Sequence, residues 1–368
     1  MVGLVAPIAL TQQERKTDMG FIIVLAAPVF FLSIAIEWWW GWRQARRGQT
    51  TAQAYRLDDA ISSISLGIMS QLSAVFTRVF RVTIYTLAYE QVALFPDEGF
   101  WWSWYGVLIA LVLYDLCYYA YHRASHEVAV FWAGHVVHHQ SQHYNLSTAL
   151  RQTTSGVVLG WVFYLPMALL GVSPLVFGIV ALIDLLYQFW VHTEHVGKLG
   201  WFDRWFCSPS NHRVHHAVND AYVDRNYGGI WVVWDRLFGS FKEEDPQEPC
   251  VYGTRKPLQS WDPLWANWQV WAGLLHDSWH ARRWADKLRV WWRHPGWRPA
   301  DVAERFPMPA FSLAATSRFE PSQTPQQLQW AVGWFVLLLG ASMDLLWHMD
   351  DMPWGHAAVS VLAITAGL

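Results

Sequence analysis

Histidine side chains are concentrated in one part of this sequence, at spacings that favour metal binding. Eleven of the sixteen histidines lie between residues 122 and 216. Residues three and four apart share one face of a helix, so repeats at this spacing direct several imidazoles to the same side. Imidazole binds iron, copper, zinc and nickel, and the sequence therefore predicts a metal centre. The repeats are His122-Arg-Ala-Ser-His126, His135-Val-Val-His138-His139, His192-Thr-Glu-His195 and His212-Arg-Val-His215-His216.

The number of imidazoles predicts two metal ions rather than one. A single metal cannot accept eight or nine imidazoles, whereas two metals with about four to six ligands each can. Two irons held by neutral imidazoles suit the activation of O2. Zinc is the alternative, although structural zinc sites are four-coordinate and usually contain cysteine. The predicted ligands are His122, His126, His135, His138, His139, His192, His212, His215 and His216, while His143 and His195 stay open.

Two carboxylates lie near the first histidine pair. Asp115 precedes His122 by seven residues and His126 by eleven, so it falls on the same helical face. Acids inside a membrane span usually have a partner, and a metal-bound imidazole needs an acceptor for its second N–H. We therefore predict Asp115 as that acceptor, with a hydrogen bond to a neighbouring hydroxyl or backbone group as the alternative. Glu127 is predicted as a site carboxylate, with a solvated surface charge as its alternative.

Two short segments frame the last histidine repeat. Ser208-Pro209 has the residue types of a helix N-cap and first helical position, so we expect a helix that carries His212, His215 and His216. The glycines of Asn226-Tyr-Gly-Gly229 predict either a tight backbone turn near the site or a plain joint between a loop and a helix.

The composition predicts a membrane protein. The chain is 53% hydrophobic and only 15% charged, and tryptophans bunch at the ends of the apolar runs, as they do at membrane interfaces. We expect an all-α, polytopic membrane helical bundle with a helical cap that carries the histidines. The sequence Gly171-Val-Ser-Pro174 predicts the turn of a helical hairpin. Apolar runs long enough to span a bilayer, or nearly so, lie near residues 20–38, 60–77, 104–121, 155–171, 174–191 and 328–347.

The basic residues predict which side of the membrane carries the site. Arg43, Arg46 and Arg47 follow the first span, which places that loop in the cytoplasm. Counting the spans forward brings all four histidine repeats to the same side. No charged segment precedes the apolar residues 1–10, so we expect no cleavable signal peptide.

The chain divides into three predicted regions. They are N-terminal transmembrane helices (1–100), a catalytic domain (101–304), and a linker with C-terminal transmembrane helices (305–368). The apolar run after His356 is short, so either the last helix is short or interfacial, or the sequence is truncated. The three cysteines lack a paired spacing and are predicted to be free thiols.

The histidine repeats and the residues around them resemble the fatty acid hydroxylase/sterol desaturase superfamily of membrane di-iron oxygenases, most closely its alkylglycerol monooxygenase branch. The resemblance covers about residues 105–300. The stretches are Tyr121-His-Arg-Ala-Ser-His-Glu127, Trp132-Ala-Gly-His135, Tyr144-Asn-Leu-Ser-Thr-Ala-Leu-Arg-Gln152, Leu186-Tyr-Gln-Phe-Trp-Val-His-Thr-Glu194, His212-Arg-Val-His-His216, and Asn226-Tyr-Gly-Gly229 with Trp234-Asp235.

The resemblance implies that the repeats other than His192-Thr-Glu-His195 bind two Fe ions and that Glu127 is functional. It implies hydroxylation of the ether-linked carbon of an alkylglycerol by O2, which yields an aldehyde and glycerol. It also implies tetrahydrobiopterin or another external reductant, since a fused cytochrome b5 module is not apparent. Gln142-His143 replaces an acidic residue that is usual in the family, which puts the substrate or reductant in doubt.

Other functions remain open at this stage. The expected partners are a lipid substrate, O2 and an external electron donor, and no nucleic acid. Within the oxygenases, a hydroxylase or desaturase of a sterol, fatty acyl or ornithine lipid is the alternative. A metal transporter is disfavoured because it would need ligands spread through the spans, whereas the histidine repeats are predicted to lie on one side of the membrane. A zinc protease of the His-Glu-x-x-His type is disfavoured because that motif is absent.

Overall fold

The computed structural model describes residues 19–48 and 55–368, so the expectation for residues 1–10 lies outside the described part. The described residues form helices joined by loops, with two isolated β-bridges, which confirms the all-α class. The elements are α2 (Met19–Arg46), α3 (Leu57–Val92), α4 (Glu98–Trp101), α5 (Trp104–Glu127), α6 (Ala129–Ala133), α7 (Val136–His139), α8 (Leu146–Ala149), α9 (Gly156–Gly160), η1 (Trp161–Tyr164), α10 (Leu165–Leu170), α11 (Pro174–Tyr187), η2 (Phe202–Arg204), α12 (Pro209–His216), α13 (Val233–Leu237), α14 (Pro263–His280), α15 (Trp284–Trp292), α16 (Ala300–Arg305), η3 (Leu313–Ala315), α17 (Pro325–His348), η4 (Met349–Asp351) and α18 (Trp354–Gly367).

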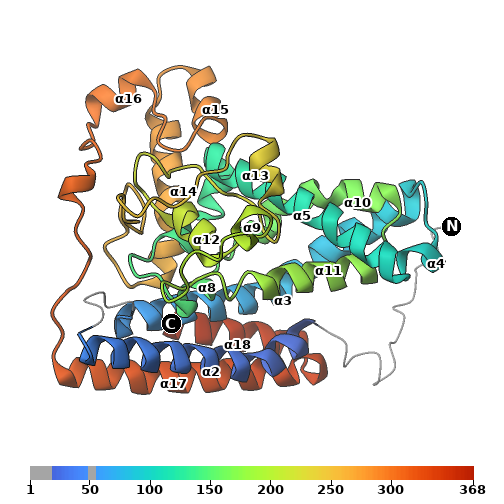
Figure 1. Ribbon diagram of the computed structural model, residues 1–368, viewed down its shortest axis with the longest axis horizontal. Coiled ribbons are helices and arrows are strands. Elements are labelled where there is room, and N and C mark those ends of the chain that lie inside the picture. The colour runs from blue at the N-terminus through green and yellow to red at the C-terminus, as the bar shows by residue number, and fades with distance from the viewer. Residues whose placement is uncertain (1–18, 49–54) are drawn as a thin grey trace.

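Four helices in the described part are long and apolar enough to cross a membrane. They correspond to four of the predicted runs, and Figure 1 shows that α2, α3, α5 and α17 extend along the long axis of the molecule. Helix α3 continues to Val92, well beyond its predicted end. The crossing segments are Val24–Arg46, Leu57–Thr77, Trp104–Glu127 and Pro325–His348.

The predicted hairpin exists, but its two arms are not full spans. The first arm is divided into α9, η1 and α10, and Pro166 stands in the first turn of α10 because its ring fits only the start of a helix. The second arm, α11, has 14 residues, whereas a span needs about 20. Gly171 makes the predicted turn with a φ of 97°, a conformation that glycine adopts without steric cost.

The cytoplasmic end predicted for the first span has the features of a membrane interface. Arg43 lies over the ring of Trp39 and Arg46 over that of Trp42, and both rings are partly exposed. Such pairs place the apolar ring toward lipid and the cation toward headgroups and water.

The long helices pack around an aromatic and aliphatic core. Tyr85, Tyr114, Tyr164, Met167 and Val176 bring together α3, α5, η1, α10 and α11 in one buried cluster. Residues 202–305, here called the cap, pack beside these helices, and α15 and α16 lie farthest from α2 and α17 (Figure 1). The cap and the ends of α5 and α11 thus surround the histidines.

Candidate metal centre

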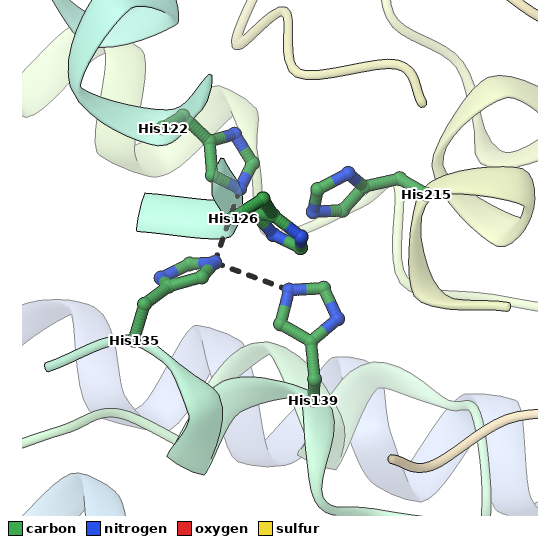
Figure 2. A group of neighbouring side chains, drawn as sticks. All are labelled: His122, His126, His135, His139 and His215. Atoms are coloured by element: carbon green, nitrogen blue, oxygen red, sulfur yellow. Dashed lines mark hydrogen bonds between the residues drawn. The ribbon is translucent and has the colours of Figure 1, made fainter. Parts of the chain in front are cut away.

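The structure brings all nine predicted ligands together in two adjacent groups. Within each group the candidate ligand atoms lie within 4.8 Å of one another. Figure 2 shows the imidazoles of the first group pointing toward a common centre. The first cluster is His122, His126, His135, His139 and His215, and the second cluster is His138, His192, His212 and His216. His143 and His195 belong to neither cluster.

Two short helices contribute to both clusters and so fix the distance between them. Helix α7 directs His139 to the first cluster and His138 to the second, while α12 directs His215 to the first and His212 with His216 to the second. Ser208 caps α12 as predicted, because its side chain accepts the Asn211 backbone N–H. Helix α5 supplies His122 and His126 from one face, one turn apart.

Backbone carbonyl groups fix the orientation and tautomer of four imidazoles. A carbonyl oxygen only accepts hydrogen bonds, so the Nδ1 atom that contacts it must carry the proton. The Nε2 atom of each of these neutral rings is then left with a lone pair, the form that binds a metal. The contacts run from Nδ1 of His122 to Tyr227 O (2.8 Å), of His138 to Arg151 O (3.0 Å), of His192 to Gln188 O (2.8 Å) and of His215 to Arg225 O (3.0 Å).

The Nε2 atoms of these rings face one another at distances that require a cation. His138 Nε2 and His192 Nε2 are 3.1 Å apart, and neither has a proton to share because both Nδ1 atoms hold it. In the first cluster, His122 Nε2 and His135 Nε2 are also 3.1 Å apart (Figure 2). Two ligands at right angles, each about 2.1 Å from one metal, have nitrogens about 3.0 Å apart. The donor set therefore fits a metal ion in each cluster.

Buried nitrogens without a hydrogen-bond partner also indicate that the first cluster fits a metal ion. The Nε2 atoms of His126 and His215 are buried and have no hydrogen-bond partner among the residues that the structure describes. A buried polar atom without a partner is costly, and a metal ion would satisfy both.

Burial favours the neutral form of most of the cluster imidazoles. Loss of hydration lowers the pKa of His138 to about 4. Burial, followed by repulsion from neighbouring imidazoles, also holds the pKa values of His135, His139, His212, His215 and His216 well below the ordinary range. Neutral imidazole is the form that binds metal, so these rings are ready to do so at pH 7.

The structure corrects the predicted partner of Asp115. Its carboxylate is fully buried, but it accepts the backbone N–H of Ile230 (2.6 Å) and the indole N–H of Trp234 (2.7 Å). Asp115 was predicted to accept from a metal-bound imidazole, but the Nδ1 of His122, the histidine nearest to it in sequence, contacts the carbonyl of Tyr227. Asp115 therefore holds the cap segment behind the site. This is the alternative stated above, a hydrogen bond to a backbone group.

Glu127 lies at the surface end of α5. Its carboxylate pairs with Arg123 at 2.9 Å and is 41% exposed, a geometry that matches the solvated alternative. A role of Glu127 in the reaction stays a prediction from the resemblance.

Asp224 supplies the carboxylate contact that had been assigned to Asp115. Its Oδ1 lies 3.6 Å from His126 Nδ1, and its Oδ2 accepts from His294 Nε2 at 2.9 Å. Burial alone would raise the pKa of Asp224, but these two histidines lower it well below the usual range. Nothing in the spacing of Asp224 pointed to this contact, because it lies in a loop distant from His126 in sequence.

Three further buried charges hold the site and were not predicted. Glu37, inside the first span, accepts the Leu146 backbone N–H at 2.8 Å and the hydroxyls of Tyr55 and Thr193. Arg151 donates to Val137 O at 2.7 Å while its own carbonyl accepts from His138. For Glu37 its place inside the first apolar run was the available signal, since a charged group is rarely placed there without a partner.

The third buried charge, Arg213, joins the last histidine helix to the loop after His192. It makes a two-pronged ion pair with Glu244, at 2.7 and 2.8 Å. It also donates to the carbonyls of Thr193 (2.9 Å) and Val196 (2.8 Å). The pair therefore fixes α12 relative to the segment that carries His192.

A cavity of about 360 Å³ reaches both clusters from the membrane helices. Its polar end is lined by His122 and His135 of the first cluster and His138 and His192 of the second. The rest is mostly apolar and is lined by α2, α3 and α17, with residues such as Phe30, Ile68, Leu339, Met343 and Leu346. The cavity is suited to an apolar chain whose end meets the imidazoles.

Comparison with known proteins first defines the class. The fatty acid hydroxylase family model matches residues 107–240, the stretch that contains both clusters. No solved structure matches the chain.

More similar relatives then define the family. The chain is 34% identical over 344 residues to the alkylglycerol monooxygenase of Danio rerio, covering 92% of this chain and 73% of that protein. It is 39% identical over 246 residues to the human alkylglycerol monooxygenase, covering 66% of this chain but only 54% of the human protein. It is 29% identical to an ornithine lipid hydroxylase of Rhizobium tropici over 187 residues, 49% of this chain and 54% of that protein. The chain belongs to the alkylglycerol monooxygenase family, which confirms the resemblance.

Proposed function

We propose that this protein is a membrane monooxygenase that uses two irons, O2 and an external reductant to hydroxylate a lipid. The proposed substrate is an alkylglycerol. Hydroxylation of its ether-linked carbon gives a hemiacetal, which breaks into a fatty aldehyde and glycerol. One oxygen atom of O2 enters the lipid and the other leaves as water, so two electrons and two protons are needed. Tetrahydrobiopterin is the proposed donor, and the relatives named alkylglycerol monooxygenase support the substrate.

The observation that carries the proposal is the pair of facing Nε2 atoms on His138 and His192, 3.1 Å apart with both Nδ1 protons held by carbonyl groups. The nine cluster histidines would hold the irons, which supply O2 activation when bound. The protein itself orients four of the imidazoles through carbonyl groups and buries most of the cluster histidines, which favours the neutral rings.

The cavity supports a lipid substrate. Its apolar wall from α2, α3 and α17 would bind the alkyl chain, while the histidine end would receive the carbon that reacts. The polar residues Gln152, Thr153 and Gln188 line the same cavity and could contact a hydroxylated headgroup. Binding of both ends would place one C–H bond reproducibly beside the clusters, and such positioning is a large part of catalysis.

We also propose that the site opens toward the cytoplasm. The support is the Arg43 and Arg46 pair at the C-terminal end of α2, together with the positive-inside rule. A cytoplasmic site gives a soluble pterin direct access. Protease or thiol-reagent labelling of sealed membrane vesicles at the cap would test this orientation separately from activity.

The activity test compares two neighbouring histidines. Purified protein is loaded with Fe(II), given an alkylglycerol, a tetrahydropterin and O2, and assayed for fatty aldehyde. We expect about two irons per chain. His192→Gln should lose iron and turnover, while the matched variant His195→Gln should keep both because His195 lies outside the clusters.

Three results would contradict the proposal. Stoichiometric zinc with full activity would exclude iron. Hydroxylation of a sterol, fatty acyl or ornithine lipid without ether cleavage would replace the substrate. Equal activity in the His192→Gln and His195→Gln proteins would exclude the second cluster from the reaction.

A further inference from the structure

The segment behind the first cluster, residues 224–230, is here called the frame segment. Three of the five imidazoles of the first cluster place their Nδ1 atoms against it. His126 faces the Asp224 carboxylate at 3.6 Å, His215 contacts Arg225 O at 3.0 Å, and His122 contacts Tyr227 O at 2.8 Å. The second cluster makes its described carbonyl contacts elsewhere, to Arg151 and Gln188. The frame segment is therefore specific to one of the two clusters.

The middle and the C-terminal end of the frame segment are held by buried carboxylates. Asp235 accepts the N–H groups of Tyr227 (2.7 Å) and Gly228 (2.8 Å). Asp115 accepts the N–H of Ile230 at 2.6 Å. Two aspartates that each bind this backbone fix where its carbonyl groups point. Both are fully buried, so their hydrogen bonds are not weakened by competing water.

The local conformation of the frame segment is also unusual. Asp224 and Asn226 have left-handed backbone angles, with φ of 58° and 57°. Asn226 is fixed there by its side chain, which donates to Asn211 O (2.9 Å) and Lys242 O (2.7 Å). At Gly229 a β-carbon would lie 2.8 Å from Asp115 Oδ1, so only glycine fits this approach.

We infer that the frame segment is an outer-shell support of the first cluster: its carbonyl groups select the metal-binding tautomer of His122 and His215, and Asp224, 3.6 Å from Nδ1 of His126, is the positioning carboxylate of His126 through its charge. This inference rests on the proposed two-metal site. A metal-ligating histidine commonly donates its other N–H to a carboxylate or carbonyl, and loss of that partner weakens metal binding by about 10- to 100-fold. Asp224 also reaches His294, which is 60% exposed, so it connects the ligand His126 to the protein surface.

Asp224 is the best position for a test because it is partly exposed and its replacement can keep the backbone. Glycine and asparagine both tolerate a left-handed φ, so Asp224→Gly and Asp224→Asn preserve the turn while removing the carboxylate or only its charge. Asp220→Asn is the matched control: it removes a nearby carboxylate that pairs with Arg255 and is 86% exposed.

The measurement is iron content and iron affinity of the purified full chain, by chelator competition, with Mössbauer spectra to separate the two sites. We expect Asp224→Gly to lower the affinity of one iron by about 10- to 100-fold and leave the other unchanged. Asp224→Asn should lose less, because its amide oxygen still accepts, and Asp220→Asn should lose nothing.

The outcomes separate this inference from the proposed function. The inference alone would be overturned if the parent, Asp224→Gly and Asp220→Asn proteins bound both irons with the same affinity. Equal weakening of both irons by Asp224→Gly would overturn it as well, because the frame segment contacts one cluster. A parent protein that binds no metal would overturn both.

Discussion

Removal of Arg213 tests how much of the stability of the centre depends on one buried ion pair. The Arg213 side chain is 8% exposed and that of Glu244 19%. Arg213→Met keeps much of the side-chain volume but removes all four described hydrogen bonds. It leaves a buried carboxylate and the carbonyls of Thr193 and Val196 without their donor.

The expected loss of unfolding free energy follows from these contacts. Breaking a buried pair by removing one partner costs about 3–5 kcal/mol, chiefly because the other charge stays buried. Since Glu244 retains some exposure, we expect a value near 3 kcal/mol. Arg123→Met is the matched control. Its pair with Glu127 is 36% and 41% exposed, and removal of such a pair costs less than about 1 kcal/mol.

The assay is reversible unfolding of the detergent-solubilised protein, followed by tryptophan fluorescence, for the two variants and the parent. Equal losses in Arg213→Met and Arg123→Met would refute the reasoning. The pH dependence is a second readout. Burial raises the pKa of Glu244, but the Arg213 hydrogen bonds and charge lower it below its ordinary value of 4.5. The contribution of the pair is therefore complete above about pH 4.5 and is lost as the pH falls through the lowered folded-state pKa.

Three other perturbations have defined outcomes. Gly229→Ala should cost about 1–3 kcal/mol of unfolding free energy by overpacking, because its β-carbon would lie 2.8 Å from two aspartate oxygens. Gly197→Ala is the control: a β-carbon there has no neighbour within 4 Å, so the unfolding free energy should not change. Met343→Trp should narrow the cavity and reduce turnover of long alkyl chains more than that of short ones. Val336→Trp, on the exposed face of α17, should leave turnover unchanged. Analysis of the products by chain length would measure this difference. Chelation of iron should lower the unfolding temperature, and re-addition of Fe(II) should restore it; an unchanged transition would exclude metal-linked stability.

The histidine spacing predicted which histidines gather in the structure but not how they divide between the clusters. Positions three and four apart on a helix share a face, which is why His122 with His126 were correctly grouped. In the second repeat the helix begins only after His135, whose φ and ψ of −128° and −31° are not helical. His138 consequently faces the second cluster while His135 and His139 face the first. A helix of four residues is too short for its periodicity to decide this.

The membrane spans were predictable to a similar degree. Uninterrupted apolar runs gave α2, α5 and α17, because length and hydropathy are what a bilayer selects. The first hairpin arm was predicted as one full span because hydropathy does not register its change to a 3-10 helix at Trp161–Tyr164. Gly160, just before this segment, packs against the ring of Tyr121, where a β-carbon would lie 2.9 Å from the ring.

The partners of the imidazoles could not be predicted, for a physical reason. Every residue carries a carbonyl group, so a sequence does not mark Tyr227 or Arg151 as acceptors. Asp115 was correctly predicted to be buried and partnered, but its partner is the backbone that presents the Tyr227 carbonyl to His122. The predicted contact is thus replaced by an indirect one through the cap.

These contacts predict that metal binding and folding are linked in this centre. Fixing the Nδ1 protons on carbonyl groups leaves the Nε2 lone pairs of His138 and His192 directed at each other inside a buried space. Protonation would relieve the repulsion, but burial lowers the pKa of His138 to about 4. A bound cation would stabilise this arrangement, so we expect the hydrogen bonds that orient these rings also to raise the affinity of the proposed site for metal.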